Sequence, residues 1–345
     1  MGVVRDERYL LHDAGPAHPE SPRRLEDLYA CLDDPEVAGL VRTIPPRLAS
    51  EEELLWNHTP EHVGRVRDAC ARGPRRLDPD TGVSPGSWEA ALLAVGGVFA
   101  GLDALARREA DVCIALVRPP GHHAEADRSM GFCLFNNVAL GAHYARRVLG
   151  CGRIMIVDWD LHHGNGTQQS FYADPDVLFA SIHQFPFYPG TGPLGETGTN
   201  AGEGHTVNVP LAAGAGDEAY AAAFNRVIVP VGLSYRPDLL LVSVGFDTHW
   251  DDPLGGMRVS LDGFAYMTRR LLELAAVCCG GRMLFCLEGG YSPRGQQEGL
   301  LAMLGECAGR SIARPEAMAG LTEAHHPAID LIAEFHRRHW PVIEG

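Results

Sequence analysis

The sequence predicts an α/β protein in which helices cover both faces of a parallel β-sheet. Short apolar runs recur along the chain without polar alternation, which is typical of strands buried on both faces. Segments rich in alanine and leucine separate several of these runs, and alternation of strands with helices favours a parallel sheet. The chain has 345 residues, of which 46% are hydrophobic. It can therefore bury a large core, and we expect a single domain over residues 1–345.

Six apolar runs are the predicted strands, and two longer segments are the clearest predicted helices. The strands are DVCIALV (111–117), RIMIVD (153–158), DVLFASI (176–182), HTVNVPL (205–211), PDLLLVSVG (237–245) and RMLFCLE (282–288). The helices are SWEAALLAVGGVFAGLDALARRE (87–109) and LDGFAYMTRRLLELAAVCC (261–279). The serine that begins the first helical segment and the aspartate near the start of the second are expected to cap them.

The chain is strongly acidic. It contains no lysine, so its 29 basic side chains other than histidine are all arginines, against 44 acidic residues and a net charge of −15. Such a surface repels nucleic-acid phosphates and anionic lipids but attracts basic peptides and polyamines. We therefore expect neither nucleic acid nor a membrane as a partner.

Cysteine content and the N-terminus indicate a cytoplasmic protein. The nine cysteines show no Cys-x-x-Cys spacing, which argues against a disulfide framework and against a cysteine zinc knuckle. The N-terminal stretch has no apolar signal-peptide core, and we see no apolar run that approaches the roughly 20 residues of a membrane span. The acidic, glycine-rich segment GPLGETGTNAGEG (192–204) is a candidate lid or homo-oligomer contact.

Polar or glycine-rich residues follow five of the six predicted strands. These segments are RPPGHHA (118–124), WDLHHGNGT (159–167), HQFPFYPGTG (183–192), FDTHWDDPLGG (246–256) and GGYS (289–292). Each one alone is compatible with an ordinary turn or with core histidines whose hydrogen bonds are satisfied. Because open parallel sheets bind ligands beyond the carboxyl ends of their strands, we expect the five segments to converge on one crevice.

The second of these segments has the pattern of a metal site. In an extended chain Asp158, Asp160 and His162 point to one face and the residues between them to the other. A solvated acidic strand end is the alternative, but carboxylates buried beside an apolar run would need a partner. Asp247, after its own strand, offers a third carboxylate. Two carboxylates, one imidazole and an open position suit a catalytic zinc or ferrous ion.

Six motifs together resemble a known family. In order they are RPPGHHA, GFCLFNN (131–137), VDWDLHHGNGT (157–167), FYPGTG (187–192), GFDTHWDDPLGG (245–256) and EGGY (288–291). They are similar to the motifs of the zinc-dependent histone deacetylases and acetylpolyamine amidohydrolases, over residues from about 18 to 291. The tryptophan between the aspartates and the HHGNG motif resemble the class II-like bacterial branch. The resemblance implies the arginase-deacetylase fold, a single eight-stranded parallel sheet flanked by helices.

The resemblance also implies the metal ligands, position by position. Asp160, His162 and Asp247 correspond to the zinc ligands, with Fe²⁺ as an alternative metal. A structural potassium ion would take oxygen atoms from Asp158, Asp160, His162 and Ser181. A second potassium ion would use the main-chain oxygens of Phe171, Asp174 and Val177.

The implied activity is removal of an acetyl or other acyl group from an amine by metal-activated water. His123 corresponds to the residue that takes and returns the proton, and His122, held cationic by Asp158, would stabilise developing charge. Tyr291 would donate a hydrogen bond to the oxyanion. Asn165 stands where another branch of the family carries an aspartate behind the base, and its amide orients the imidazole without bringing charge.

The remaining matched positions describe a narrow tunnel for the substrate. Its implied walls and mouth are Gly131, Phe132, Tyr188, Leu254, Gly289 and Gly290. An acidic side chain at the position of Leu254 would pair with the distal ammonium of a polyamine, whereas leucine offers that charge no partner. We therefore expect an acyl-lysine peptide or a small acylated amine, with acetylpolyamine as the alternative.

Three other functions are compatible with parts of the sequence. An arginase-type ureohydrolase of the same fold needs a second metal and more bridging aspartates than DWDLHHGN supplies. A non-catalytic acyl-group binding protein would be favoured if the oxyanion tyrosine were missing, but Tyr291 is present. A nucleic-acid regulator is disfavoured by the net charge of −15 and by the absence of a basic helix.

Overall fold

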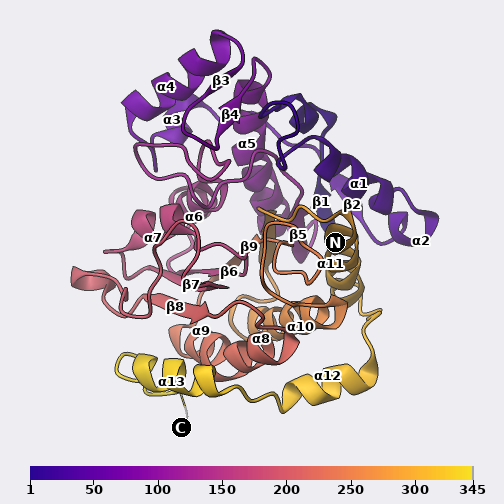
Figure 1. Ribbon diagram of the computed structural model, residues 1–345, viewed down its shortest axis with the longest axis vertical. Helices are drawn as coiled ribbons and strands as arrows, with labels where there is room; N and C mark the ends of the chain where they lie inside the picture. Colours follow the sequence, from indigo (N-terminus) through magenta and orange to yellow (C-terminus); the bar gives the residue numbers. More distant parts are fainter. Residues whose placement is uncertain (344–345) are drawn as a thin grey trace.

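The computed structural model describes residues 1–343 and is built around one eight-stranded sheet (Figure 1). The strand order is β2-β1-β5-β10-β9-β6-β7-β8, and every neighbouring pair is parallel. The strands are β1 (Gly2–Val4), β2 (Arg42–Ile44), β5 (Val112–Ala115), β6 (Ile154–Asp158), β7 (Val177–Gln184), β8 (Thr206–Leu211), β9 (Leu239–Val244) and β10 (Met283–Leu287). All six predicted strands are confirmed. β1 and β2 were not predicted, because each has only three residues and therefore shows too little of a hydrophobic pattern.

Helices cover both faces of this sheet, as the fold class requires. One face is covered by α5 (Ser87–Ala106), which contacts β1, β5 and β10, and by α6 (Asn137–Arg147), which contacts β9. The other face is covered by α8 (Asp217–Ala223), α9 (Val229–Tyr235) and α10 (Leu261–Cys278) (Figure 1). Around them lie α1 (Arg23–Leu32), α2 (Pro35–Ala38), α3 (Glu51–Leu54), α4 (Pro60–Ala71), α7 (Asn165–Phe171), α11 (Pro293–Cys307), α12 (Pro315–Thr322) and α13 (Pro327–His336). Residues 75–76 (β3) and 82–83 (β4) form a small antiparallel pair.

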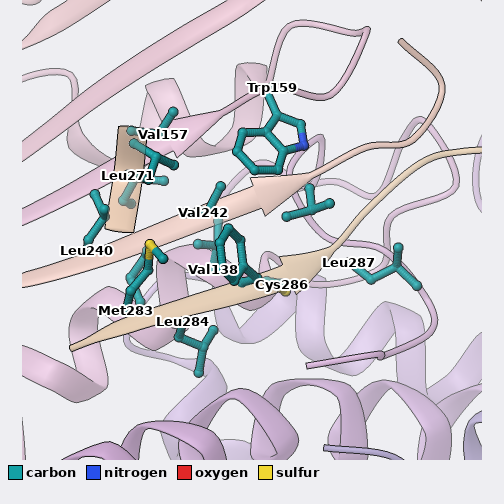
Figure 2. Packing of buried hydrophobic residues seen from close by; sticks show 14 of the residues in the cluster. Val138, Val157, Trp159, Leu240, Val242, Leu271, Met283, Leu284, Cys286 and Leu287 are labelled. Atoms are coloured by element: carbon teal, nitrogen blue, oxygen red, sulfur yellow. The ribbon is translucent and has the colours of Figure 1, made fainter. Parts of the chain in front are cut away.

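The core consists of side chains between the central strands and the two helical layers. Figure 2 shows Val157 of β6, Val242 of β9 and Leu284 of β10, together with Val138 from α6 and Leu271 from α10. All five are at most 2% exposed. Because both faces of β6, β9 and β10 are covered, their sequences contain no polar alternation.

Both predicted helices are present, but the expected caps are wrong. Ser87 lies inside the first turn of α5, and its hydroxyl accepts the main-chain N–H of Ser84. In α10 the capping side chain is Ser260, which accepts the N–H of Asp262. The Asp262 carboxylate instead accepts the main-chain N–H of Arg314, so a long-range contact replaces the expected local one.

Helix α5 also corrects the expectation that no segment approaches the length of a membrane span. Its 20 residues are long and apolar enough to cross a bilayer by length and composition alone. The share of its most apolar window that is buried inside the protein is 72%. Packing against the sheet therefore accounts for the composition of α5 without a membrane.

The strand order brings together the loops on which a site depends. β5, β10, β9 and β6 are consecutive in the sheet, and their register places Asp158, the last residue of β6, beside Ser243 of β9. Leu287, the last residue of β10, is paired with Val244. The segments that follow these four strands therefore emerge side by side at one edge of the sheet.

Two helical glycines should respond oppositely to replacement by alanine. A Cβ on Gly96 of α5 would lie 1.9 Å from the main-chain oxygen of Arg47, whereas a Cβ on Gly64 of α4 would meet nothing closer than 4.0 Å. Alanine raises helix propensity by about 1 kcal/mol in both helices, but overpacking costs about 1–3 kcal/mol. We expect Gly64→Ala to raise and Gly96→Ala to lower the free energy of unfolding, measured by urea denaturation. An equal gain in both variants would show that α5 tolerates a side chain at this contact.

Candidate metal centre and active site

The loops after the central strands enclose a cavity of about 240 Å³. Its lining residues are Asp80, Pro120, His122, His123, Gly131, Phe132, Asp160, His162, Phe187, Tyr188, Leu254, Gly289 and Tyr291. Ten of these positions were named from the sequence. Asp158, Asn165 and Asp247 were also named and lie directly behind the lining, in contact with it.

Asp160, His162 and Asp247 form a compact cluster of metal-ligating side chains. One ligand atom from each residue lies within 4.8 Å of the other two. His162 Nδ1 is 3.1 Å from Asp160 Oδ1 and 3.3 Å from Asp247 Oδ2. Local hydrogen bonds hold this arrangement, because Asp160 Oδ1 accepts the His162 N–H and Asp247 Oδ1 accepts the Leu161 N–H.

The surroundings of this cluster fit a bound cation. Both carboxylates are buried, and Asp247 Oδ2 has no hydrogen-bond partner, which is costly unless a positive charge compensates it. A Cβ on Gly289 would lie 2.2 Å from Asp247 Oδ2, and one on Gly245 would lie 2.2 Å from Asp160 Oδ2. Glycine at both positions leaves the carboxylates room. Although burial lowers the pKa of His162, the hydrogen bond to Asp160 and the negative charge of Asp247 raise it to about 9.

His122 is held in its charged form by the carboxylate behind it. Its Nδ1 lies 3.0 Å from Asp158 Oδ2, and its Nε2 lies 3.7 Å from Asp160 Oδ1. Burial alone would lower the pKa of His122, but the negative charges of Asp158 and Asp160 outweigh burial and raise it to about 10. The main-chain N–H groups of Gly121 and His122 also donate to the buried carboxylate of Glu288, which fixes this loop at the end of β5.

His123 is held in its neutral form. Burial lowers its pKa well below the usual range, and the neighbouring positive charges of His122 and His162 lower it further. Its Nδ1 lies 2.8 Å from Asn165 Oδ1. The two adjacent histidines thus differ in charge: His122 is a cation, whereas His123 is neutral and can accept a proton.

Tyr291 is positioned from two sides. Asp252 Oδ2 accepts the main-chain N–H groups of Tyr291 and Ser292 at 2.7 and 3.1 Å. The Arg24 guanidinium lies 4.9 Å from the centre of the Tyr291 ring and donates to the main-chain oxygen of Gly290. Burial raises the pKa of Tyr291 well above its usual range, so the phenol remains protonated and can donate a hydrogen bond. Gly290, with φ of +112°, does not line the cavity; a Cβ there would meet Phe246.

The aromatic walls of the cavity depend on a loop that the sequence analysis did not use. Phe132 has a φ of +69°, a conformation that non-glycine residues rarely adopt. The Thr81 hydroxyl accepts the Phe132 N–H, and Asp80 Oδ1 accepts the N–H of Gly131. The 80–81 segment therefore holds the wall in place. Opposite, the ring of Tyr188 meets that of His123 edge to face, with centroids 5.2 Å apart.

The residues named for potassium are near one another, but potassium itself stays a prediction. Asp158 and Ser181 are paired in the register of β6 and β7, and the Ser181 hydroxyl is hydrogen-bonded to His183 Nδ1. Phe171 and Asp174 close one turn between α7 and β7, just before Val177 begins β7.

Several functional contacts escaped the sequence analysis. Pro120 and Phe187 were overlooked although they lie inside quoted motifs, and Asp80 lies outside all of them. Asp252 lies inside the quoted motif at 245–256, two residues before Leu254, whereas Glu125 directly follows the motif at 118–124. Their partners lie 39 and 40 positions away, a distance that no local pattern encodes.

Comparison with known proteins identifies the family. A family model described as histone deacetylase domain matches residues 18–307. A probable deacetylase from Archaeoglobus fulgidus is 40% identical over 299 residues, covering 85% of this chain and 82% of that protein. A histone deacetylase-like amidohydrolase from Pseudomonas aeruginosa is 39% identical, covering 83% and 80%. The crystal structure of the HDA15 HD domain superposes with a TM-score of 0.88 at 37% identity, covering 99% of this chain and 96% of the other. The chain, with its eight-stranded parallel sheet and its Asp-His-Asp cluster, belongs to the histone deacetylase and acetylpolyamine amidohydrolase family.

Proposed function

We propose that this protein is a zinc-dependent amidohydrolase that removes acetyl or other acyl groups from an amine, with acyl-lysine as the favoured substrate. The observation that carries the proposal is the convergence of metal-ligating and proton-transferring groups on one cavity. Asp160 and His162 line it with His122, His123 and Tyr291, and Asp247 stands directly behind them. The relatives named as deacetylases support the hydrolase class.

The Asp160, His162 and Asp247 side chains are the residues that would hold the metal. Two carboxylates and one imidazole that leave further positions open suit catalytic zinc, and Fe²⁺ takes a similar donor set. When bound, the metal would lower the pKa of a water molecule toward about 7 and polarise the acyl carbonyl.

The two histidines divide the proton transfers. His123, neutral and tied through Nδ1 to Asn165, uses Nε2 to take a proton from the attacking water. It then returns that proton to the nitrogen of the leaving amine. His122 stays protonated against Asp158 and stabilises the negative charge that develops on the reacting centre.

Tyr291 and the tunnel walls supply the rest of the chemistry. The phenol of Tyr291 donates to the carbonyl oxygen as it becomes an oxyanion. The ring of Phe132 meets that of Tyr291 edge to face at 5.8 Å and desolvates the stem of the substrate together with Tyr188. A non-catalytic acyl-binding role would not need a protonated tyrosine at this place.

An arginase-type activity is not supported by the metal ligands present. Within residues 1–343, the Asp160, His162 and Asp247 group is the only cluster of three such side chains close enough to share an ion. A binuclear centre would need further bridging carboxylates at the same place.

Cytoplasmic location and self-association stay predictions. All nine cysteine thiols are unpaired. The segment proposed as a lid or contact is hydrogen-bonded to the protein itself, because Glu196 accepts the side chain of Gln168 and the N–H of Gly192.

The first prediction from the proposed function concerns the metal ligands. Asp247→Ala should abolish stoichiometric zinc binding, measured by competition with a chromophoric chelator, because it removes one of only three protein ligands. The wild-type protein, stripped with a chelator, should regain hydrolysis on addition of zinc, iron or cobalt. Asp262→Asn changes another buried acid, paired with Arg314, and should leave zinc binding intact. Wild-type zinc affinity in Asp247→Ala would contradict the ligand assignment.

The second prediction concerns the oxyanion. Tyr291→Phe should lower kcat by about 10²–10³ with little change in KM, because the hydroxyl acts mainly in the transition state. Tyr220→Phe is the matched control, since Tyr220 is buried, has an unpaired hydroxyl and does not line the cavity. An effect of Tyr291→Phe on KM alone would assign the tyrosine to binding only.

The third prediction concerns the substrate class. Leu254 lines the cavity and gives a distal ammonium no partner, so kcat/KM should be higher for an acetyl-lysine peptide than for acetylspermidine. Leu254→Glu should raise kcat/KM for acetylspermidine. Asp80 also lines the cavity, with Oδ1 engaged by Gly131 and Thr81. A wild-type preference for the polyamine, or no gain in polyamine turnover from Leu254→Glu, would show that position 254 does not determine the substrate class.

A further inference from the structure

A carboxylate lies behind the His123–Asn165 pair, in a place where the sequence indicated only an uncharged amide. Asn165 Nδ2 donates to Glu125 Oε1 at 2.7 Å, while Asn165 Oδ1 lies 2.8 Å from His123 Nδ1. The three side chains form a continuous line from Glu125 to the cavity. Glu125 is 9% exposed, and Asn165 is 5% exposed.

The chemistry of these groups fixes which way the amide points. An asparagine amide has one end that only accepts and one that only donates, and the two ends have nearly the same shape. A carboxylate only accepts, so the NH₂ group of Asn165 must face Glu125 and its oxygen must face His123. The other acceptors near Nδ2, the main-chain oxygen of His123 and the sulfur of Met130, are both 3.4 Å away and bind it weakly.

The direction of the amide determines the tautomer of His123. Because Asn165 Oδ1 can only accept, Nδ1 of the neutral imidazole must carry the proton, and Nε2 keeps its lone pair. If the amide turned over, its NH₂ group would face Nδ1 and the ring proton would have to move to Nε2. A ring protonated at Nε2 has no lone pair to accept a proton from water there.

Glu125 is itself firmly placed. Arg128 donates to it through Nε and Nη2, both at 2.9 Å, and Gln169 Nε2 donates at 3.1 Å. Its main-chain oxygen is 2.9 Å from His58 Nδ1. A carboxylate with this many contacts cannot rotate away from Asn165 without breaking several of them.

We propose that Glu125 is a positioning residue for the reaction: it holds the Asn165 amide in the one orientation that keeps Nε2 of His123 free as the proton acceptor. This inference rests on the proposed function, in which His123 takes the proton from water. Asn165 therefore does not orient the His123 ring by itself, because the direction of its own amide depends on Glu125.

The arrangement predicts that Asn165→Asp is harmful by itself. Aspartate would place a second carboxylate about as close to Glu125 as the present 2.7 Å contact, where the two negative charges repel each other. Changing Glu125→Gln at the same time removes that repulsion and supplies an amide donor to the new carboxylate. That carboxylate can only accept, so it holds the His123 proton on Nδ1 without help.

The experiment is a double-mutant cycle on the zinc-loaded enzyme. Glu125→Gln and Asn165→Asp should each lower kcat about tenfold or more with little change in KM, as partial loss of general base catalysis allows. The double variant should recover to within about threefold of the wild type. Glu306→Gln is the matched control, because Glu306 accepts two hydrogen bonds from Arg269 in the same bidentate manner and does not line the cavity. It should leave kcat unchanged.

A spectroscopic measurement makes the test independent of turnover. In ¹⁵N-histidine-labelled protein, the long-range ¹H–¹⁵N spectrum should show His123 protonated at Nδ1 in the wild type and in the double variant. In Glu125→Gln a fraction should be protonated at Nε2. Wild-type kcat and tautomer in Glu125→Gln, or additive losses in the double variant, would overturn the inference. Absence of amide hydrolysis by the wild type would overturn the proposed function while the tautomer still tests the role of Glu125.

Discussion

The burial of negative charge at the ends of the central strands is the constraint on which the rest of the site depends. Asp158, Asp160 and Asp247 are all fully buried, close to one another and next to an apolar core. Such a group is stable only if positive charge enters with it. The imidazolium of His122 compensates the charge of Asp158, and the cluster of Asp160, His162 and Asp247 is arranged so that it could hold a metal ion. The negative charge that makes these carboxylates costly to bury is thus the same property that suits them to a metal ion.

A second group of buried charged residues, Glu20, Arg24 and Arg118, fixes the loops of the site relative to the sheet. Glu20 accepts hydrogen bonds from Arg118, which follows β5, and from Arg24 of α1. Arg24 in turn donates to the main-chain oxygens of Glu288 and Gly290, at the end of β10. The side chains of Glu20, Arg24 and Arg118 are all buried. The N-terminal segment therefore reaches the tyrosine loop through hydrogen bonds from Arg24, which Glu20 holds by an ion pair, and the position of Tyr291 depends on residues far earlier in the chain.

Two carboxylates outside the cavity orient residues of the site by accepting hydrogen bonds from them. Asp252 fixes Tyr291 through two main-chain N–H groups, and Glu125 fixes Asn165 through its NH₂ group. In both cases a carboxylate outside the cavity decides the direction of a group that borders it. Hydrogen bonds to charged acceptors are stronger than neutral ones, so each of these contacts can hold a loop against thermal motion.

The sequence by itself determined six strands, the edge of the sheet where polar residues gather and the candidate metal donors. Continuous apolar runs and residue type are local properties, so six of the eight strands and the candidate ligands Asp160, His162 and Asp247 could be predicted from them, whereas the roles of His122 and His123 followed only from the resemblance of the motifs to a known family. The tertiary structure decided what lies behind them: β1 and β2, the cap of α10, the Asp80 and Thr81 support of Phe132, and the charge that Glu125 supplies behind Asn165. Most of these contacts join residues far apart in the chain, and a hydrogen bond between two such side chains leaves no periodic trace in either segment. Such residues meet only when the sheet assembles and buries both side chains.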